Sequence, residues 1–305
     1  MKILVTGGAG FIGSHLVDRL TAQKYRVVVV DDLSTGKKAN LNKKAKFYRL
    51  DIQDKRLEQI FIKEKPAVVY HLAAQMNVRK SIADPLFDAR TNILGVLNLL
   101  ENCVKYKVKK FVFISTGGAI YGDDVKIPTP ETATEAPISP YGIAKLATEK
   151  YLHYYYHQYG LKYTVLRLAN VYGPRQNFQG EAGVVAIFCH QLKNNQPLFI
   201  NGPGRQTRDF VFVSDVVAAC LKALNDKKSN IYNIATSQEN NINQLVATLQ
   251  KVSGIKTPVK HRQAIKGEQL RSCLDYHKIK KHLRWSPQYD LESGLRETWK
   301  WFQNN

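Results

Sequence analysis

The chain has 305 residues, of which 44% are hydrophobic and 10% aromatic, enough for one large α/β unit or two lobes with a sizeable core. No apolar run approaches the roughly 20 residues of a membrane span, and the four cysteines (Cys103, Cys189, Cys220 and Cys273) lack metal-ligand or disulfide spacing, so we expect a cytoplasmic protein without a membrane span or a metal site. The net charge of +20 comes from lysines spread along the chain, which is typical of a solvated surface that attracts anionic small molecules rather than of a specific nucleic-acid interface.

The first stretch predicts a strand, a glycine-rich turn and a helix. The apolar residues 3–5 come first, and apolar residues at helical spacing follow over 14–20. Between them, Gly7 permits a tight turn, Gly10 lets the backbone approach a pyrophosphate, and Gly13 lets the helix and the strand pack closely. The phosphate oxygens would then face free N–H groups at the positive end of the helix dipole.

A second apolar run, over residues 27–30, ends in Asp31 and Asp32. Asp31 can accept hydrogen bonds from both hydroxyls of an adenosine ribose and would repel a 2′-phosphate. NAD rather than NADP is therefore the expected cofactor. The glycine spacing Gly-x-x-Gly-x-x-Gly resembles that of the short-chain dehydrogenase/reductase superfamily.

Two further predicted strands have ends that suit a dinucleotide. The strand predicted over residues 47–50 is followed by Asp51 and Ile52. A carboxylate beside an apolar side chain suits the edge of an adenine ring. A helix over 57–65 precedes a buried strand over 67–72. That strand is followed by Ala73, Ala74 and Gln75. Small side chains there would let the cofactor's phosphates and nicotinamide ribose come close.

The alternation of strands and helices continues to residue 168. The pattern predicts a long helix over 85–106, a strand over 110–114, a helix over 141–159 and a strand over 163–168. Such a pattern indicates an α/β fold with a doubly wound parallel sheet, whose ligands lie beyond the carboxyl ends of the strands. Every motif noted here follows a strand at that edge, so we expect the motifs to form one site.

From residue 173 the pattern changes to a smaller lobe that is interleaved with the first. Its predicted elements are a helix within 178–194, strands over 197–200, 207–213 and 231–234, helices over 214–224 and 240–252, and a C-terminal helix with Trp299 and Trp301. The strand over 231–234 is expected to return to the main sheet. We assign 1–169 plus about 206–236 to a NAD-binding Rossmann domain, and about 170–205 plus 237–305 to a substrate lobe.

Tyr141 and Lys145 carry the predicted chemistry. Their i, i+4 spacing places both side chains on one face of a helix. A nearby ammonium favours the phenolate over the phenol, so the tyrosine can act as a general base. Thr116, at the end of an adjacent strand, can hydrogen-bond the hydroxyl that loses its proton.

These motifs together resemble the extended short-chain dehydrogenase/reductases, and most closely the UDP-glucose 4-epimerase family. The similar segments are 7–13, 31–36, 51–52, 71–75, 115–122, 141–145, 170–176 and 206–211, and more weakly 267–268 and Asp275. The resemblance implies reversible oxidation at C4 of a UDP-hexose through a 4-keto sugar, with NAD regenerated in each turnover. It also implies a homodimer formed by the helices over 85–106 and 141–159.

The resemblance and the motifs together give three sets of expected site residues. The catalytic set is Tyr141, Lys145, Thr116 and Ser115. The cofactor set is Gly7, Gly10, Phe11, Ile12, Gly13, Asp31, Asp32, Leu33, Ser34, Thr35, Gly36, Asp51, Ile52, Leu72, Ala73, Ala74, Gln75, Thr91, Tyr141 and Lys145. The substrate set is Thr116, Asn170, Arg175, Arg208, Arg271 and Ser272, with Asn170 and Arg208 on the diphosphate. A surface ion pair with Asp209 is the alternative role for Arg208.

The sequence departs from the family pattern at two positions. Gly117 occupies the usual place of a hydroxyl residue, and Thr116, with Ser115 behind it, is the substitute. Ile265 replaces the arginine of the family's phosphate motif, so Lys266, Arg262 or Arg271 would have to compensate. By the same resemblance, Ser272 stands where a bulky tyrosine would exclude N-acetyl groups, which predicts that N-acetyl sugars are accepted.

Other functions fit parts of the sequence. A 4,6-dehydratase needs an Asp-Glu pair after the strand-end threonine, and UDP-glucuronate decarboxylases tend to carry a glutamate there, but this chain has Gly117 and Gly118. A UDP-glucuronate 4-epimerase remains an alternative. A non-catalytic NAD-sensing or RNA-binding protein is a further alternative, although such a protein would not need the Tyr141–Lys145 pair.

Overall fold

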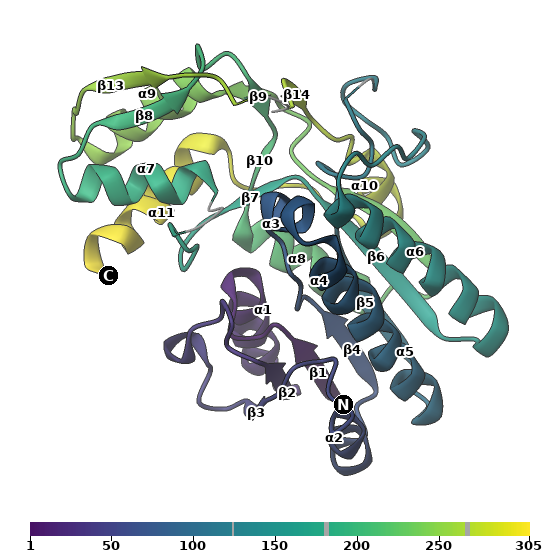
Figure 1. Cartoon of the computed structure of the whole chain (residues 1–305). Coiled ribbons are helices and arrows are strands. Elements are labelled where there is room, and N and C mark those ends of the chain that lie inside the picture. Colours follow the sequence, from purple (N-terminus) through teal and green to yellow (C-terminus); the bar gives the residue numbers. More distant parts are fainter. Residues whose placement is uncertain (124, 180–182, 266–268) are drawn as a thin grey trace.

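Seven parallel strands form the main sheet of the computed structural model, in the order β11-β6-β5-β4-β1-β2-β3 (Figure 1). The structure describes residues 1–123, 125–179, 183–265 and 269–305. The strands are β1 (Lys2–Thr6), β2 (Arg26–Asp31), β3 (Lys46–Arg49), β4 (Val68–His71), β5 (Lys110–Thr116), β6 (Lys162–Leu168) and β11 (Asn230–Ile234). The strand order reverses between β1 and β4, where sheets of this kind bind ligands. The predicted doubly wound sheet is confirmed, including the return of the strand near residue 231.

Helices cover both faces of this sheet because successive side chains of a strand point to opposite sides. Ile3 and Val5 of β1 pack in one buried cluster with α1 (Phe11–Ala22) and α8 (Val213–Leu224). Leu4 packs in a second cluster with α2 (Leu57–Glu64), α5 (Gly95–Lys105) and α6 (Pro140–Tyr159).

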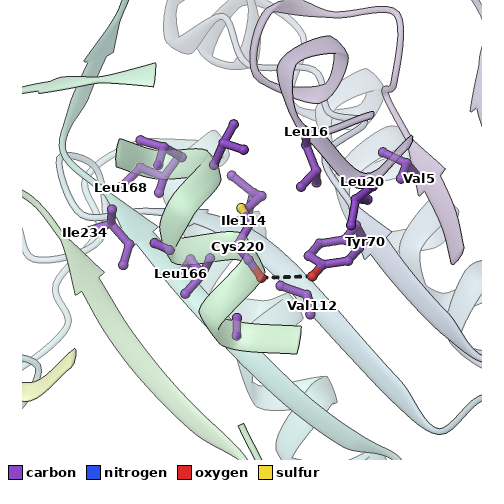
Figure 2. Close-up of a cluster of buried hydrophobic side chains, with 14 of the residues drawn as sticks. Val5, Leu16, Leu20, Tyr70, Val112, Ile114, Leu166, Leu168, Cys220 and Ile234 are labelled. Atoms are coloured by element: carbon purple, nitrogen blue, oxygen red, sulfur yellow. Dashed lines mark hydrogen bonds between the residues drawn. The ribbon is translucent and has the colours of Figure 1, made fainter. Parts of the chain in front are cut away.

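The first cluster also contains a polar link between the sheet and a helix. Tyr70 of β4 is fully buried, and its hydroxyl donates to the carbonyl oxygen of Cys220 in α8 at 2.8 Å (Figure 2). The phenol therefore packs as an apolar ring without leaving an unpaired hydroxyl in the core.

The predicted helix over 85–106 is interrupted by a π-helical turn. It consists of α4 (Pro85–Ala89), the turn η2 (Arg90–Leu94) and α5, with Asp84 as the N-cap of α4. A short helix, α3 (Val78–Ala83), precedes it and was not predicted. Isolated π-turns widen a helix locally and are frequent at functional sites.

Beyond residue 169, the described part of the chain also forms short sheets and three helices that pack together. The strand β7 (Asn170–Tyr172) pairs with β10 (Phe210–Phe212), β8 (Leu198–Asn201) pairs with β13 (Val259–Arg262), and β9 (Thr207–Arg208) lies between β12 (Asn240–Asn241) and β14 (Arg271–Ser272). The helices α7 (Val184–Lys193), α9 (Ile242–Ser253) and α11 (Leu291–Asn304) surround a core that includes Phe188, Leu245 and Trp299. The short helices η1 (Lys38–Asn40) and α10 (His277–Leu283) lie outside this core.

The prediction of one strand over 207–213 is wrong. Asp209 interrupts it, so β9 joins one small sheet and β10 another. The Asp209 carboxylate is 1% exposed and accepts hydrogen bonds from the backbone N–H groups of Thr236 and Ser237 at 2.9 and 3.0 Å. A buried carboxylate needs such partners, and turning toward them breaks the strand.

Within the described ranges, no helix is both long and apolar enough to cross a membrane. All four cysteines are buried and carry free thiols.

Candidate active site

The glycine-rich turn lies at the point where the strand order reverses. Gly7 has a φ of +70°, and a Cβ on it would lie 2.6 Å from the backbone nitrogen of Ala73, just beyond β4. A Cβ on Gly13 would lie 2.1 Å from the carbonyl oxygen of Gly7. A Cβ on Gly10, by contrast, would meet only that carbonyl, at 3.2 Å. Protein packing therefore requires glycine at positions 7 and 13, whereas a Cβ at position 10 would have a single close neighbour, as expected where the backbone is to approach a pyrophosphate.

The sequence reasoning missed one glycine in this turn. A Cβ on Gly8 would lie 2.7 Å from Cγ1 of Val29 in β2. The turn thus packs tightly against the second strand as well, and only the folded structure brings these two residues together.

Asp31 holds the loop after β2 against the glycine turn. One carboxylate oxygen accepts from the N–H of Ala9 and the other from the N–H of Leu33, both at 2.9 Å. Burial raises the pKa of Asp31, and the two backbone hydrogen bonds oppose that shift. Asp32 instead accepts from the N–H and hydroxyl of Ser34 within its own turn. Asp31 therefore keeps a fixed acceptor at the strand end, while Asp32 is directed elsewhere.

The other predicted cofactor residues lie along the same edge of the sheet. Phe11 and Ile12 begin α1; Leu33, Ser34, Thr35 and Gly36 follow β2; Asp51 and Ile52 follow β3; Leu72, Ala73, Ala74 and Gln75 follow β4; and Thr91 lies in η2. Asp51 is exposed and accepts from the N–H of Gln53, whereas Ile52 is buried.

Tyr141 and Lys145 lie in the first two turns of α6. Lys145 is 5% exposed, and its Nζ donates to the carbonyl oxygen of Ile114 in β5 at 2.9 Å. The same Nζ lies 5.8 Å from the centroid of the Tyr141 ring. Burial lowers the pKa of Lys145 to about 8, and the carboxylates of Asp88 and Glu149 oppose the shift. The ammonium is thus held between the sheet and the tyrosine, as a Tyr–Lys pair requires.

Thr116 and Ser115 end β5 but differ in their surroundings. Thr116 is half-buried, whereas the hydroxyl of Ser115 is buried and donates to Oε1 of Glu149 at 2.6 Å. The Ser115 hydroxyl is thus held inside the protein, whereas Thr116 is partly accessible at the strand end.

Ser115 belongs to a buried set of polar residues that we call the Arg167 cluster: Arg167, Glu149, Glu135, Tyr121 and Ser115. Arg167 is 0% exposed and contacts both carboxylate oxygens of Glu149 through Nε, at 3.0 and 3.1 Å. The sequence analysis missed this cluster because its members come from β5, β6, α6 and the loop between β5 and α6.

The register of β9 and β14 divides the predicted substrate residues into two groups. Ser272 pairs with Arg208 and Arg271 pairs with Thr207, so Ser272 and Arg208 project from one face and Arg271 from the other. The guanidinium of Arg271 contacts both oxygens of Glu239, at 3.0 and 2.6 Å. The hydroxyl oxygen of Ser272 lies 3.9 Å from the position of a Cβ on Gly118, so its face looks toward the end of β5.

The remaining predicted substrate residues are placed differently. Asn170 is exposed at the start of β7. Arg175 contacts the Asp18 carboxylate of α1 at 2.7 Å. Arg262 stacks on the Phe199 ring at 3.7 Å, and Lys266 lies outside the described residues, as do Gly267 and Glu268.

The glycine turn at a doubly wound switch point defines the class as that of dinucleotide-binding proteins. The chain belongs to the NAD-dependent epimerase/dehydratase family, whose model matches residues 3–235.

Individual relatives match the chain from end to end. It is 52% identical to a UDP-glucose 4-epimerase of Thermotoga maritima, solved with UDP-glucose, with a TM-score of 0.97 over 100% of this chain and 99% of that one. It is 41% identical to a Thermus thermophilus UDP-glucose 4-epimerase, solved with NAD, with a TM-score of 0.94 over 99% of each chain. It is also 44% identical to a putative UDP-glucose 4-epimerase of Methanocaldococcus jannaschii, over 99% of each chain.

Proposed function

We propose that the protein is a NAD-dependent epimerase that inverts C4 of UDP-glucose and UDP-galactose. The observation that carries the proposal is the Tyr141–Lys145 pair, fixed to β5 beside the glycine turn. The likeness to UDP-glucose 4-epimerases over the whole chain supports the same activity.

Bound NAD supplies the oxidation and reduction at C4, and the chain supplies the proton chemistry. The phenolate of Tyr141 accepts the proton of the C4 hydroxyl and returns it after the 4-keto sugar has turned over in the pocket. The Lys145 ammonium stabilises the phenolate, and Thr116 orients the hydroxyl by a hydrogen bond. Ser115 is not assigned a catalytic role, because Glu149 holds its hydroxyl.

Substrate recognition is assigned to the face that Arg208 and Ser272 share, together with Asn170 at the start of β7. Arg208 would pair with the diphosphate, since a guanidinium matches two phosphate oxygens. Arg175 and Arg271 stay proposed substrate residues, and to reach a phosphate each would have to leave its partly exposed ion pair, with Asp18 and Glu239 respectively. The Rossmann part, 1–169 plus about 206–236, would bind NAD, and the substrate lobe, about 170–205 plus 237–305, would bind the sugar nucleotide.

The direct test is to incubate the purified protein separately with UDP-glucose, UDP-N-acetylglucosamine and UDP-glucuronate and to identify the product sugars. Formation of UDP-galactose supports the proposal. A dehydrated product, or epimerisation of the uronate alone, would contradict it.

NAD should be preferred over NADP because Asp31 offers a carboxylate where a 2′-phosphate would lie. Asp31→Asn should reduce this preference by about tenfold to a hundredfold, since a hydrogen bond to a charged group contributes about 1.5–3 kcal/mol. Titration of the apo-protein with both cofactors measures the ratio. Asp32→Asn is the matched control, because Ser34 holds that carboxylate. Equal affinities in the wild type would remove Asp31 from its role.

Ser272 should admit N-acetyl sugars. Ser272 is 9% exposed and close to Gly118, two residues beyond β5, so a tyrosine ring at position 272 would take up space beside that strand end. Ser272→Tyr should lower kcat/KM for UDP-N-acetylglucosamine by about 10- to 200-fold, with UDP-glucose as the internal reference. If the wild type ignores the N-acetyl sugar, or the variant handles both equally well, Ser272 does not control the choice.

We also propose a cytoplasmic homodimer. Large exposed apolar side chains lie on α4, η2 and α6, which pack against one another: Leu86 (67% exposed), Leu94 (57%) and Ile143 (52%). Burial of these side chains in a protein–protein interface would remove their apolar surface from water. The free cysteine thiols suit a reducing compartment.

A further inference from the structure

Asp88 in α4 is a buried carboxylate with one unsatisfied oxygen. It is 1% exposed, and its Oδ1 accepts from the side-chain amides of Gln75 and Asn92, both at 2.9 Å. Its Oδ2 is also buried and has no hydrogen-bond partner among the described residues. A buried charge in this condition is costly unless an opposite charge lies nearby.

Lys145 supplies that opposite charge. The helix α6 packs against α4. Burial raises the pKa of Asp88, and the hydrogen bonds from Gln75 and Asn92 and the Lys145 ammonium oppose that shift. In return, Asp88 is the largest favourable charge acting on Lys145. The lysine needs such a partner, since it is 5% exposed and its Nζ donates to the Ile114 carbonyl, which carries no negative charge.

The other charged and titratable groups that face Lys145 cannot serve as its counter-charge in the same way. Glu149, on the same helix, is neutralised by Arg167, which contacts both of its oxygens. His71 of β4 has its pKa lowered to about 3 by burial and by Lys145 itself, so it is neutral. Tyr141 is the proposed general base, whose phenolate the Lys145 ammonium stabilises. Among the groups named here, Asp88 is therefore the carboxylate whose negative charge is not already offset by another arginine or lysine.

We propose that Asp88 is a positioning residue for the active site, whose carboxylate keeps Lys145 in the ammonium form beside Tyr141. The proposal rests on the proposed function only for the purpose of the ammonium, which is to stabilise the Tyr141 phenolate. Through Gln75, which follows β4, the same carboxylate also ties this charge to the predicted cofactor edge.

The proposal predicts a definite direction of change. The Asp88 carboxylate favours the charged lysine, so Asp88→Asn should lower the pKa of Lys145 by about one unit or more. Asn is nearly isosteric, and its carbonyl oxygen can still accept from Gln75 and Asn92. Asp88→Glu keeps the charge and should stay closer to the wild type.

The first readout does not depend on turnover. In protein labelled at lysine ¹³Cε and loaded with NAD, an NMR titration follows Lys145, whose signal is assigned by its loss in Lys145→Arg. The matched control is Asp215→Asn, because Asp215 is also buried but accepts from the N–H groups of Gln288 and Tyr289 instead. The Lys145 pKa should fall in Asp88→Asn and not in Asp215→Asn. An unchanged value in Asp88→Asn overturns the proposal.

The second readout is the pH profile of UDP-glucose turnover. In Asp88→Asn the loss of kcat on the alkaline side should begin about one unit lower than in the wild type, and the two enzymes should approach each other at acid pH. A uniform loss at every pH would indicate a merely structural role and would contradict the proposal.

If the wild type turns over no sugar, the proposed function fails while the NMR titration still decides the role of Asp88. If Asp88→Asn does not fold, the same interaction is tested from the other side, by measuring the pKa of Asp88 in Lys145→Met. This pKa should rise when the ammonium is removed, and an unchanged pKa overturns the proposal.

Discussion

Turnover should fall by about 10²- to 10⁴-fold when Tyr141 is replaced by Phe, which is the usual loss on removing a general base. Only the hydroxyl disappears, so the ring that lies 5.8 Å from the Lys145 ammonium remains. The helix α6 should also remain, because the Ser139 side chain that caps it and accepts from the Gly142 N–H is untouched. We therefore expect kcat to fall while the affinity for NAD and the melting temperature stay near their wild-type values.

The matched control for this prediction is Tyr156→Phe, on the same helix. Tyr156 is 38% exposed and lies more than three turns further along α6, so its hydroxyl is far from the predicted chemistry. That variant should retain wild-type kcat. Near-normal turnover in Tyr141→Phe would place the proton transfer on another group.

Local patterns were sufficient to predict the main sheet and the cofactor turn. A strand followed by an amphipathic helix is a local pattern, and the positive φ of Gly7 and the close approach of Gly13 to the Gly7 carbonyl arise within the same short segment. The Tyr141–Lys145 spacing is also local, because i and i+4 share a face of any helix. These features needed no knowledge of which distant segments meet.

The errors in the predicted elements come from partners that are distant in sequence. Asp209 breaks the predicted strand because its carboxylate turns toward Thr236 and Ser237. In the π-turn η2, the side-chain amide of Asn92 donates to the carbonyl oxygen of Gln75, 17 residues earlier in the chain, which periodicity alone cannot anticipate. Tertiary hydrogen bonds override local preference in both cases.

The roles of the predicted site residues stay predictions, because each role depends on partners that are distant in sequence. Arg175 and Arg271 have the right chemistry for a phosphate, but Asp18 and Glu239 hold them, and the register of β14 turns Arg271 away from Ser272. Asp88 went unnoticed because its importance depends on a lysine that lies far along the chain. A charged residue in a sequence thus indicates a possible role, and its buried partners decide which role it has.

Arg167→Met should lower the free energy of unfolding by about 3–5 kcal/mol, the usual cost of leaving a buried charge without its partner. Arg167 contacts both oxygens of Glu149, and its other nitrogens reach Glu135 and the hydroxyl of Tyr121, each at 2.8 Å. After the substitution, the buried carboxylate of Glu149 would retain only the Ser115 hydroxyl as a donor among these residues. Urea unfolding of the wild type and the variant measures the difference.

Two further variants separate the loss of the ion pair from a simple loss of packing. Adding Glu149→Gln to Arg167→Met removes the stranded charge while leaving an oxygen to accept from Ser115, so the double variant should be more stable than the single one. Arg296→Met breaks an exposed pair with Glu292 in α11 and should cost at most about 1 kcal/mol. If the double variant were no more stable than Arg167→Met, the cost would lie in the missing side-chain volume and not in the unpaired charge of Glu149. Because Ser115 directly precedes Thr116, and Glu149 lies one turn of α6 after Lys145, a loosened cluster should also lower kcat in the single variant.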